Sequence, residues 1–416
     1  MIRNKKNKKI QLLAPAGSFT CLATAIQAGA DAVYFGIDKL NMRSNGNNNF
    51  TLEDLAEITT TCHNAGLAAY LTLNTVMYDH DLMFVRSIIK SAKKNKVDAI
   101  IAHDIAVISL VREAGLPIHI STQANVTNIE SIKFYAAFAD LIVLSRELSL
   151  EQIKIITKEI VRKKIKGASG ELIKIEVFIH GALCMATSGK CYISLHTNYA
   201  SANRGACVQN CRRKYIVRDA DSGHEFRLEN DYIMSAKDLC TIDFLDKIIE
   251  SGVSVLKIEG RGRSEDYVFA VTKCYREAIT SIEENSFTEL KVKLWKEELG
   301  KVFNRGFWEG YYLGRETGEW HNSDGSAATQ KKVLIGKGER YYPKIKVAEI
   351  RLESNELKIG DEIMVSGPVD GVHYETIKEM RVDDICREKV IKGELVSIPI
   401  ARKIRSTDKI YKIIQQ

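Results

Sequence analysis

Short apolar runs alternate with helical patterns over the first 260 or so residues. Ser149–Gln152 has the pattern of a capping box, and Thr51–Asp54 has that of a helix start with acids in the first turn. The apolar runs are Gln11–Gly17, Ala32–Gly36, Ala68–Asn74, Ala99–Asp104, Ile118–Asn125, Leu141–Arg146, Ile175–Gly181 and Val255–Gly260. Alternation of this kind predicts parallel βαβ units, and eight strands match an α/β fold of the (β/α)8 TIM-barrel type. A doubly wound sheet could give the same alternation, but no Gly-x-Gly-x-x-Gly follows the first run.

The alternation is interrupted once, by about 70 residues between the seventh and eighth runs. We therefore predict a barrel domain over residues 1–283 with an insertion at 182–240. Residues 284–330 have helical and then turn-rich patterns and are interpreted as a connector. Alternating β runs from 331 to 416, among them Tyr342–Ile350, Glu362–Val365 and Lys389–Ile391, predict a small C-terminal β-barrel.

Composition adds constraints on location and partners. The apolar runs are far shorter than the roughly 20 residues of a membrane span, and the lysine-rich start has no apolar segment typical of a secretory signal. We expect a cytoplasmic protein with no membrane association. The formal charge of +7, concentrated in the N-terminal arm and in Lys158–Lys166, is compatible with a polyanionic partner without requiring one.

Four of the nine cysteines fall within one short span of the insertion. They are Cys184, Cys191, Cys207 and Cys211, with Cys240 a little downstream. In a cytosolic chain, clustered cysteines favour metal or redox chemistry over disulfides. Structural zinc usually has two short Cys knuckles, and here only the last two cysteines are so spaced. The spacing leaves zinc, an iron–sulfur cluster and free thiols open.

Polar residues follow most of the predicted strands, and a barrel would gather them at one mouth. The neutral and acidic candidates for catalysis are His180, Glu259, Gln123 and Asn125, although no acid or base is assigned. The cationic candidates, predicted to bind an anionic substrate, are Arg43, Arg146, Lys257 and Arg261. The alternative is that many strand-end residues, such as Asn74, His103, Asp104 and Glu147, only cap helices or bind loop backbone. Neither Gly-x-Ser-x-Gly nor His-Glu-x-x-His occurs, so no motif predicts a protease.

The segment Glu176–Ser194, EVFIHGALCMATSGKCYIS, resembles the signature of the collagenase-like peptidases, a "U" family of unassigned mechanism. Further matching motifs are Leu13–Gly17, Ser121–Asn125, Leu144–Leu148, Ser235–Leu239, Lys257–Arg261 and Phe303–Phe307. The resemblance covers nearly the whole chain. It is strongest to the branch of tRNA hydroxylation proteins, in particular the longer partner of the two-protein version in Gram-positive bacteria.

This resemblance implies a function. Some members of the family make 5-hydroxyuridine at the tRNA wobble position without oxygen, using prephenate, and others hydroxylate a ribosomal cytidine or a ubiquinone precursor. It implies an iron–sulfur cluster, of 4Fe-4S type, on Cys184, Cys191, Cys207 and Cys211, with Cys240 as a rival for the fourth position. It further implies tRNA and a paralogous protein as partners. The alternatives are a collagenase-like peptidase and a non-catalytic tRNA-binding scaffold with a structural metal.

Overall fold

The computed structural model describes residues 10–38, 40–43, 49–218, 220–223, 225–226, 232, 234–314, 318–321 and 325–416. Within these ranges eight parallel strands close a barrel, because β11 pairs with both β1 and β7. The strands are β1 (Gln11–Pro15), β2 (Ala32–Phe35), β3 (Ala68–Leu73), β4 (Ala99–Ala102), β5 (Ile118–Ile120), β6 (Leu141–Val143), β7 (Lys174–Ala182) and β11 (Val255–Ile258). The TIM-barrel fold and all eight predicted strands are confirmed. The predicted basic N-terminal arm lies outside the described residues.

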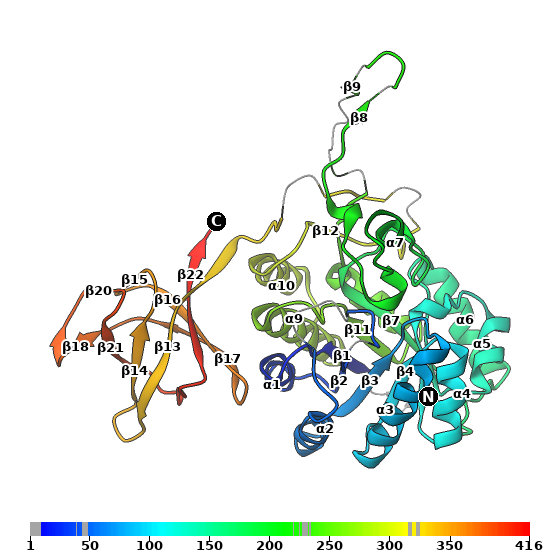
Figure 1. Cartoon of the computed structure of the whole chain (residues 1–416), viewed down its shortest axis with the longest axis horizontal. Coiled ribbons are helices and arrows are strands. Elements are labelled where there is room, and N and C mark those ends of the chain that lie inside the picture. The colour runs from blue at the N-terminus through cyan, green and yellow to red at the C-terminus, as the bar shows by residue number, and fades with distance from the viewer. Residues whose placement is uncertain are drawn as a thin grey trace.

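Helices surround the barrel and cover the outer sides of its strands (Figure 1). They are α1 (Phe19–Gln27), α2 (Leu55–Asn64), α3 (Leu82–Lys94), α4 (Ile105–Ala114), α5 (Ile129–Ala136), α6 (Leu150–Arg162), α8 (Leu245–Glu250) and α9 (Glu265–Glu283). The predicted capping box is present at α6, where Ser149 accepts a hydrogen bond from the Gln152 amide and the Gln152 side chain accepts one in return. No helix in the described ranges is long and apolar enough to cross a membrane.

Two further strands extend the barrel sheet, one from the insertion between β7 and β11 and one from a segment that follows β11 in the chain. Strand β10 (Asp238–Cys240) runs antiparallel to β7 and parallel to β12 (Phe307–Trp308). Before β10 the chain forms α7 (Ile193–Asn198), two short 3-10 turns, and the hairpin β8 (Val217–Arg218) and β9 (Glu225–Phe226), which projects beyond the barrel on the same side as α7 (Figure 1). The insertion is therefore attached to the barrel through β10.

The segment after α9 continues the barrel's hydrophobic core. Helix α10 (Glu289–Lys301) packs against α9, with Trp295 and Leu299 buried in the same cluster of side chains as the barrel strands. The Trp295 indole N–H donates to Glu277 Oε2 at 2.9 Å.

The C-terminal residues form a separate antiparallel sheet around their own core. Its main strands are β13 (Gln330–Tyr342), β14 (Val347–Leu352), β16 (Glu362–Gly367), β17 (Gly371–Thr376), β18 (Arg381–Val382), β19 (Ile385–Cys386), β21 (Leu395–Pro399) and β22 (Lys409–Gln415), with β15 (Glu356–Lys358) and β20 (Lys389–Ile391) as a separate pair. The prediction of one strand over Tyr342–Ile350 was wrong, because the chain turns between β13 and β14 at Pro343–Lys346, where Lys346 has a φ of +53°. Proline has no amide hydrogen to donate to a sheet, which suits a turn.

Two sets of polar contacts fix this domain to the barrel. Lys332 forms ion pairs with Glu265 and Asp266 at the start of α9, at 2.9 and 2.7 Å. The Gln27 side chain, at the end of α1, both donates to the Val372 carbonyl and accepts from the Val372 amide. The sheet is thus held against α1 and α9, on the outside of the barrel.

Candidate functional site

A cavity of about 580 Å³ opens at the carboxyl ends of the barrel strands, where the insertion forms part of its wall. Among the described residues that line it, Glu259 is the one carboxylate. The lining cations are Arg43, Arg146, Arg212, Lys257, Arg261, Arg263 and Arg305. Side chains of this charge favour anionic ligands.

The four clustered cysteines all line this cavity as free thiols. Burial raises the pKa of the Cys211 thiol and Arg212 lowers it, while the neighbouring thiols of Cys184, Cys207 and Cys191 raise it further. The Cys211 thiol is therefore close to the other three thiols. These four cysteines are the groups here that could hold a thiolate-bound metal centre.

Polar contacts hold the cysteine-bearing loops in place. The Cys191 amide donates to Asn203 Oδ1 at 3.1 Å. Arg204 forms an ion pair with Asp81 at 2.6 Å, and Arg212 donates to the Leu183 carbonyl at 2.6 Å and to Ala236. The insertion is thus tied to the loop after β3 and to the segment before β10.

Cys240 and His180 lie away from the cavity. They are paired opposite each other on β10 and β7, both buried. Cys240 Sγ is 3.8 Å and His180 Nδ1 is 3.3 Å from the hydroxyl of Tyr275. Burial raises the pKa of Cys240 to about 11 and, together with Arg263, lowers that of His180 to about 3. The structure brings neither residue to the barrel mouth.

Glu259 is held as a carboxylate by its neighbours. It pairs with Arg43 at 2.6 Å. Burial alone would raise the pKa of Glu259, but Arg43, and to a lesser degree Arg261 and Arg146, lower it to about 2. This group is therefore ionised at neutral pH, where it can pair with cations but has no proton to donate.

The predicted cations differ in how tightly they are bound. Arg261 is buried and donates to Asn41 Oδ1 at 2.9 Å and Thr72 Oγ1 at 2.8 Å; burial lowers its pKa to about 10, which leaves it charged at neutral pH. Lys257 pairs with the fully buried Glu176 at 2.7 Å.

Arg146 is anchored in a different way. Its guanidinium donates to the Ala182 carbonyl at 3.3 Å and to Ser188 Oγ at 3.1 Å, and it contacts no carboxylate among the described residues. Arg146, like Arg261, is thus a predicted substrate-binding cation that forms no ion pair with a carboxylate among the described residues.

The two predicted amides occupy different positions. Gln123 lines the cavity and accepts hydrogen bonds from Ser121 and from Asn74 at 3.3 Å. Asn125 lies behind it and donates to the Ser188 carbonyl at 3.1 Å, which joins the loop after β5 to the insertion. Asp104 caps α4, so this strand-end residue has the helix-capping role that was the alternative to substrate binding.

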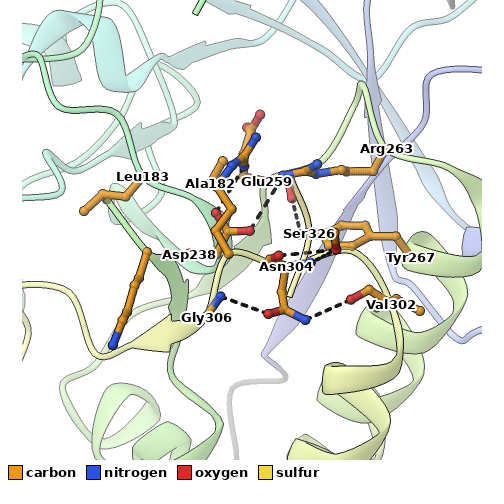
Figure 2. Close-up of polar contacts among 12 residues, drawn as sticks. Ala182, Leu183, Asp238, Glu259, Arg263, Tyr267, Val302, Asn304, Gly306 and Ser326 are labelled. Carbon is orange, nitrogen blue, oxygen red and sulfur yellow. Dashed lines mark hydrogen bonds and ion pairs between the residues drawn. The ribbon is translucent and has the colours of Figure 1, made fainter. Parts of the chain in front are cut away.

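The sequence did not predict that a buried carboxylate, Asp238, lies behind two cavity-lining arginines (Figure 2). The buried carboxylate of Asp238 lies 3.7 Å from Arg263 and 3.5 Å from Arg305, and both arginines line the cavity. Nearby, Asn304 shapes the loop before β12 by donating to the Val302 carbonyl and accepting from the Gly306 amide (Figure 2). Asp238 lies in the family motif Ser235–Leu239, and Asn304 and Arg305 lie in the motif Phe303–Phe307. Neither motif follows a barrel strand, so the strand-end rule could not place these three residues.

Residues 17–322 match the family described as peptidase family U32. The chain belongs to this family. It is 50% identical over 402 residues to a Porphyromonas gingivalis protein named collagenase, with 97% of each chain covered. It is 33% identical over 368 residues to tRNA hydroxylation protein P1 of Bacillus subtilis, covering 87% of this chain and 84% of the relative. It is also 37% identical over 275 residues to the 23S rRNA 5-hydroxycytidine C2501 synthase of Escherichia coli, covering 66% of this chain and 40% of that U32 relative. The predicted family resemblance is confirmed.

Proposed function

We propose that this U32 protein acts in RNA modification, as an enzyme or enzyme subunit that converts the wobble uridine of tRNA to 5-hydroxyuridine. The observation that carries the proposal is the meeting of four cysteine thiols and seven cationic side chains around one cavity at the barrel mouth. Two relatives named for tRNA and rRNA hydroxylation support a role in base modification.

An iron–sulfur cluster, of 4Fe-4S type, on Cys184, Cys191, Cys207 and Cys211 is the cofactor that we propose. Among the described residues, there is no group of three or more His, Cys, Asp or Glu side chains close enough together to hold a single metal ion. A cluster needs a wider set, because its thiolates bind different iron atoms. Arg212, beside Cys211, offsets negative charge on such a centre. When bound, the cluster would supply electron transfer or a Lewis-acidic iron at the cavity.

The anionic co-substrate follows from the overall reaction. Replacing the C5–H bond of uracil by C5–OH adds one oxygen atom and removes two electrons from the base. Without dioxygen, a co-substrate must accept the electrons, and the oxygen atom must come from that co-substrate or from water. Prephenate, which the family resemblance implies, is a dicarboxylate, and guanidinium groups bind carboxylates through paired hydrogen bonds. We propose that Arg146 and Arg261 bind the carboxylates of prephenate. Arg43, which is positioned by its ion pair with Glu259, lies in the same cavity.

The test is analysis of tRNA nucleosides by mass spectrometry in cells that lack the gene. We expect 5-hydroxyuridine and its derivatives to disappear, and to return with the wild-type gene but not with Cys184→Ala. Cys386→Ala is the matched control, because Cys386 is an exposed cysteine of the C-terminal domain. Unchanged 5-hydroxyuridine in a strain without a paralogue would refute the proposal. Full activity of Cys184→Ala would favour the scaffold alternative, with a structural metal.

A second candidate function, peptidase activity, is favoured by the name of the 50% identical relative. The geometry gives it little support, because His180, which precedes Cys184 in the sequence, is buried against Tyr275. Cleavage of denatured collagen that is lost in Cys184→Ala and retained in Cys386→Ala would establish it.

A further inference from the structure

Two tyrosines flank the short helix α7 of the insertion, Tyr192 at its N-cap and Tyr199 at its C-cap. Both are exposed, as are Leu195 and His196 on the helix between them. Tyr192 is 68% and Tyr199 is 95% exposed. The other side of the helix holds the buried Ser194, which accepts a hydrogen bond from the Val208 amide. We call these four exposed residues the α7 platform.

The backbone of Tyr199 makes its exposure more unusual. This residue ends α7 in the left-handed conformation, with φ at +53°. Glycine or asparagine usually occupies such a position, because a bulky side chain is strained there. Tyr199 thus carries a local conformational cost and gains no burial in return. A large aromatic side chain at such a position indicates a role in binding.

Charge identifies what this surface would bind. The chain carries 53 acidic residues in 416, about one in eight, yet residues 177–218 contain none. The same stretch contains six basic residues: Lys190, Arg204, Arg212, Arg213, Lys214 and Arg218. Lys190, Arg213, Lys214 and Arg218 are exposed. Exposed aromatic rings among basic side chains, with no carboxylate between them, fit single-stranded nucleic acid, whose bases stack and whose phosphates pair with cations.

The α7 platform borders the cavity at its Tyr192 end. Cys191 and Ile193, the two neighbours of Tyr192 in the chain, both line it, as do Cys207 and Arg212. A strand of RNA lying on the platform could therefore place one nucleotide in the cavity, while adjacent bases remain on the tyrosines. Enzymes that modify a base must take it out of its stack.

We propose that Tyr192 and Tyr199 stack on unpaired bases that flank the target nucleotide, and that Arg213 and Lys214 bind the phosphates beside them. This inference rests on the proposed RNA substrate and adds the residues that hold the unpaired strand. A protein bound at the same face is the competing interpretation, which the experiment below separates.

The experiment measures the affinity of the full chain for a labelled single-stranded RNA by fluorescence anisotropy, without turnover. Stacking contributes about 1–3 kcal/mol per base, so Tyr192→Ala with Tyr199→Ala should weaken binding at least about tenfold. The corresponding phenylalanine variant should bind like the wild type, because it keeps the rings. Phe134→Ala is the control, since Phe134 is an exposed aromatic residue on α5.

Salt dependence separates the two parts of the surface. The tyrosine-to-alanine variant should keep the wild-type slope of log affinity against log salt, because stacking releases no counterions. Arg213→Ala with Lys214→Ala should make the slope shallower. Equal affinity of wild type and the alanine variant, loss of binding in the phenylalanine variant, or no binding by the wild type would each overturn the proposal. So would self-association, seen in sedimentation, that the alanine variant abolishes without any change in RNA affinity. RNA binding through the tyrosines without any hydroxylation would leave the platform standing and refute only the proposed reaction.

Discussion

Replacing Lys257 by methionine should destabilise the barrel strongly, even though Lys257 lines the cavity. Its ammonium group is 2.7 Å from Glu176 Oε1 and lies over the Tyr34 ring, 4.5 Å from its centre. Glu176 is fully buried, and its other oxygen has no hydrogen-bond partner among the described residues. Removing one partner of a buried ion pair costs about 3–5 kcal/mol, because the remaining charge is left without a partner. For a barrel of roughly 270 residues, the unfolding entropy is roughly 0.6 kcal/mol per kelvin, so the melting temperature should fall by about 5–9 °C.

A double-mutant cycle followed by thermal unfolding at a fixed scan rate tests this reasoning. Glu176→Gln alone should also destabilise, because it leaves the lysine charge buried. The double variant, Lys257→Met with Glu176→Gln, should recover most of the loss, because no uncompensated charge remains. If the losses of the single variants simply add in the double variant, the two groups are not coupled and the reasoning is refuted. The recovered double variant then allows substrate binding by Lys257 to be measured on a stable barrel.

Three further outcomes are expected. Anaerobically purified Cys211→Ser should lose iron and acid-labile sulfide while Cys240→Ser retains both, because Cys211 lines the cavity and Cys240 does not. Asp238→Asn should raise the KM for an anionic substrate more than it changes kcat, since it removes the negative charge that positions Arg263 and Arg305. Burial lowers the pKa of His119 to about 3, so this residue should contribute about 1.4 kcal/mol of stability loss per pH unit as the pH falls from 6.5 to 3, because the unfolded chain takes up a proton there that the folded chain does not. His119→Phe, whose ring can still pack edge-on against Tyr70, should make the dependence of stability on pH shallower by this amount in denaturant titrations.

Each of these outcomes has a contrary result. Equal iron content in Cys211→Ser and Cys240→Ser would show that the cofactor is not bound by the cavity cysteines. A fall in kcat alone for Asp238→Asn would argue against a positioning role in binding. An unchanged pH slope in His119→Phe would show that other groups dominate the acid sensitivity.

Local patterns in the sequence determined the barrel and much of its mouth. Apolar runs of strand length, separated by capped helices such as α6, specify βαβ units, and parallel strands in a barrel must place their carboxyl ends together. That geometry is why the sequence alone predicts that Arg146, Gln123 and Glu259 belong to one site, and all three line the cavity. The co-location of the four insertion cysteines also followed from spacing, because they lie within one short segment.

Only the tertiary structure decided which of these residues face the cavity. Cys240 and His180 are excluded because β10 pairs antiparallel with β7 and turns both side chains into the core beside Tyr275, a pairing between distant segments that no local pattern encodes. The position of Asp238 beside Arg263 and Arg305 also depends on long-range pairing, since its strand joins the sheet from the insertion rather than from a βα repeat. The periodicity of a chain specifies which elements form, whereas long-range pairing and burial determine what each polar side chain can contact.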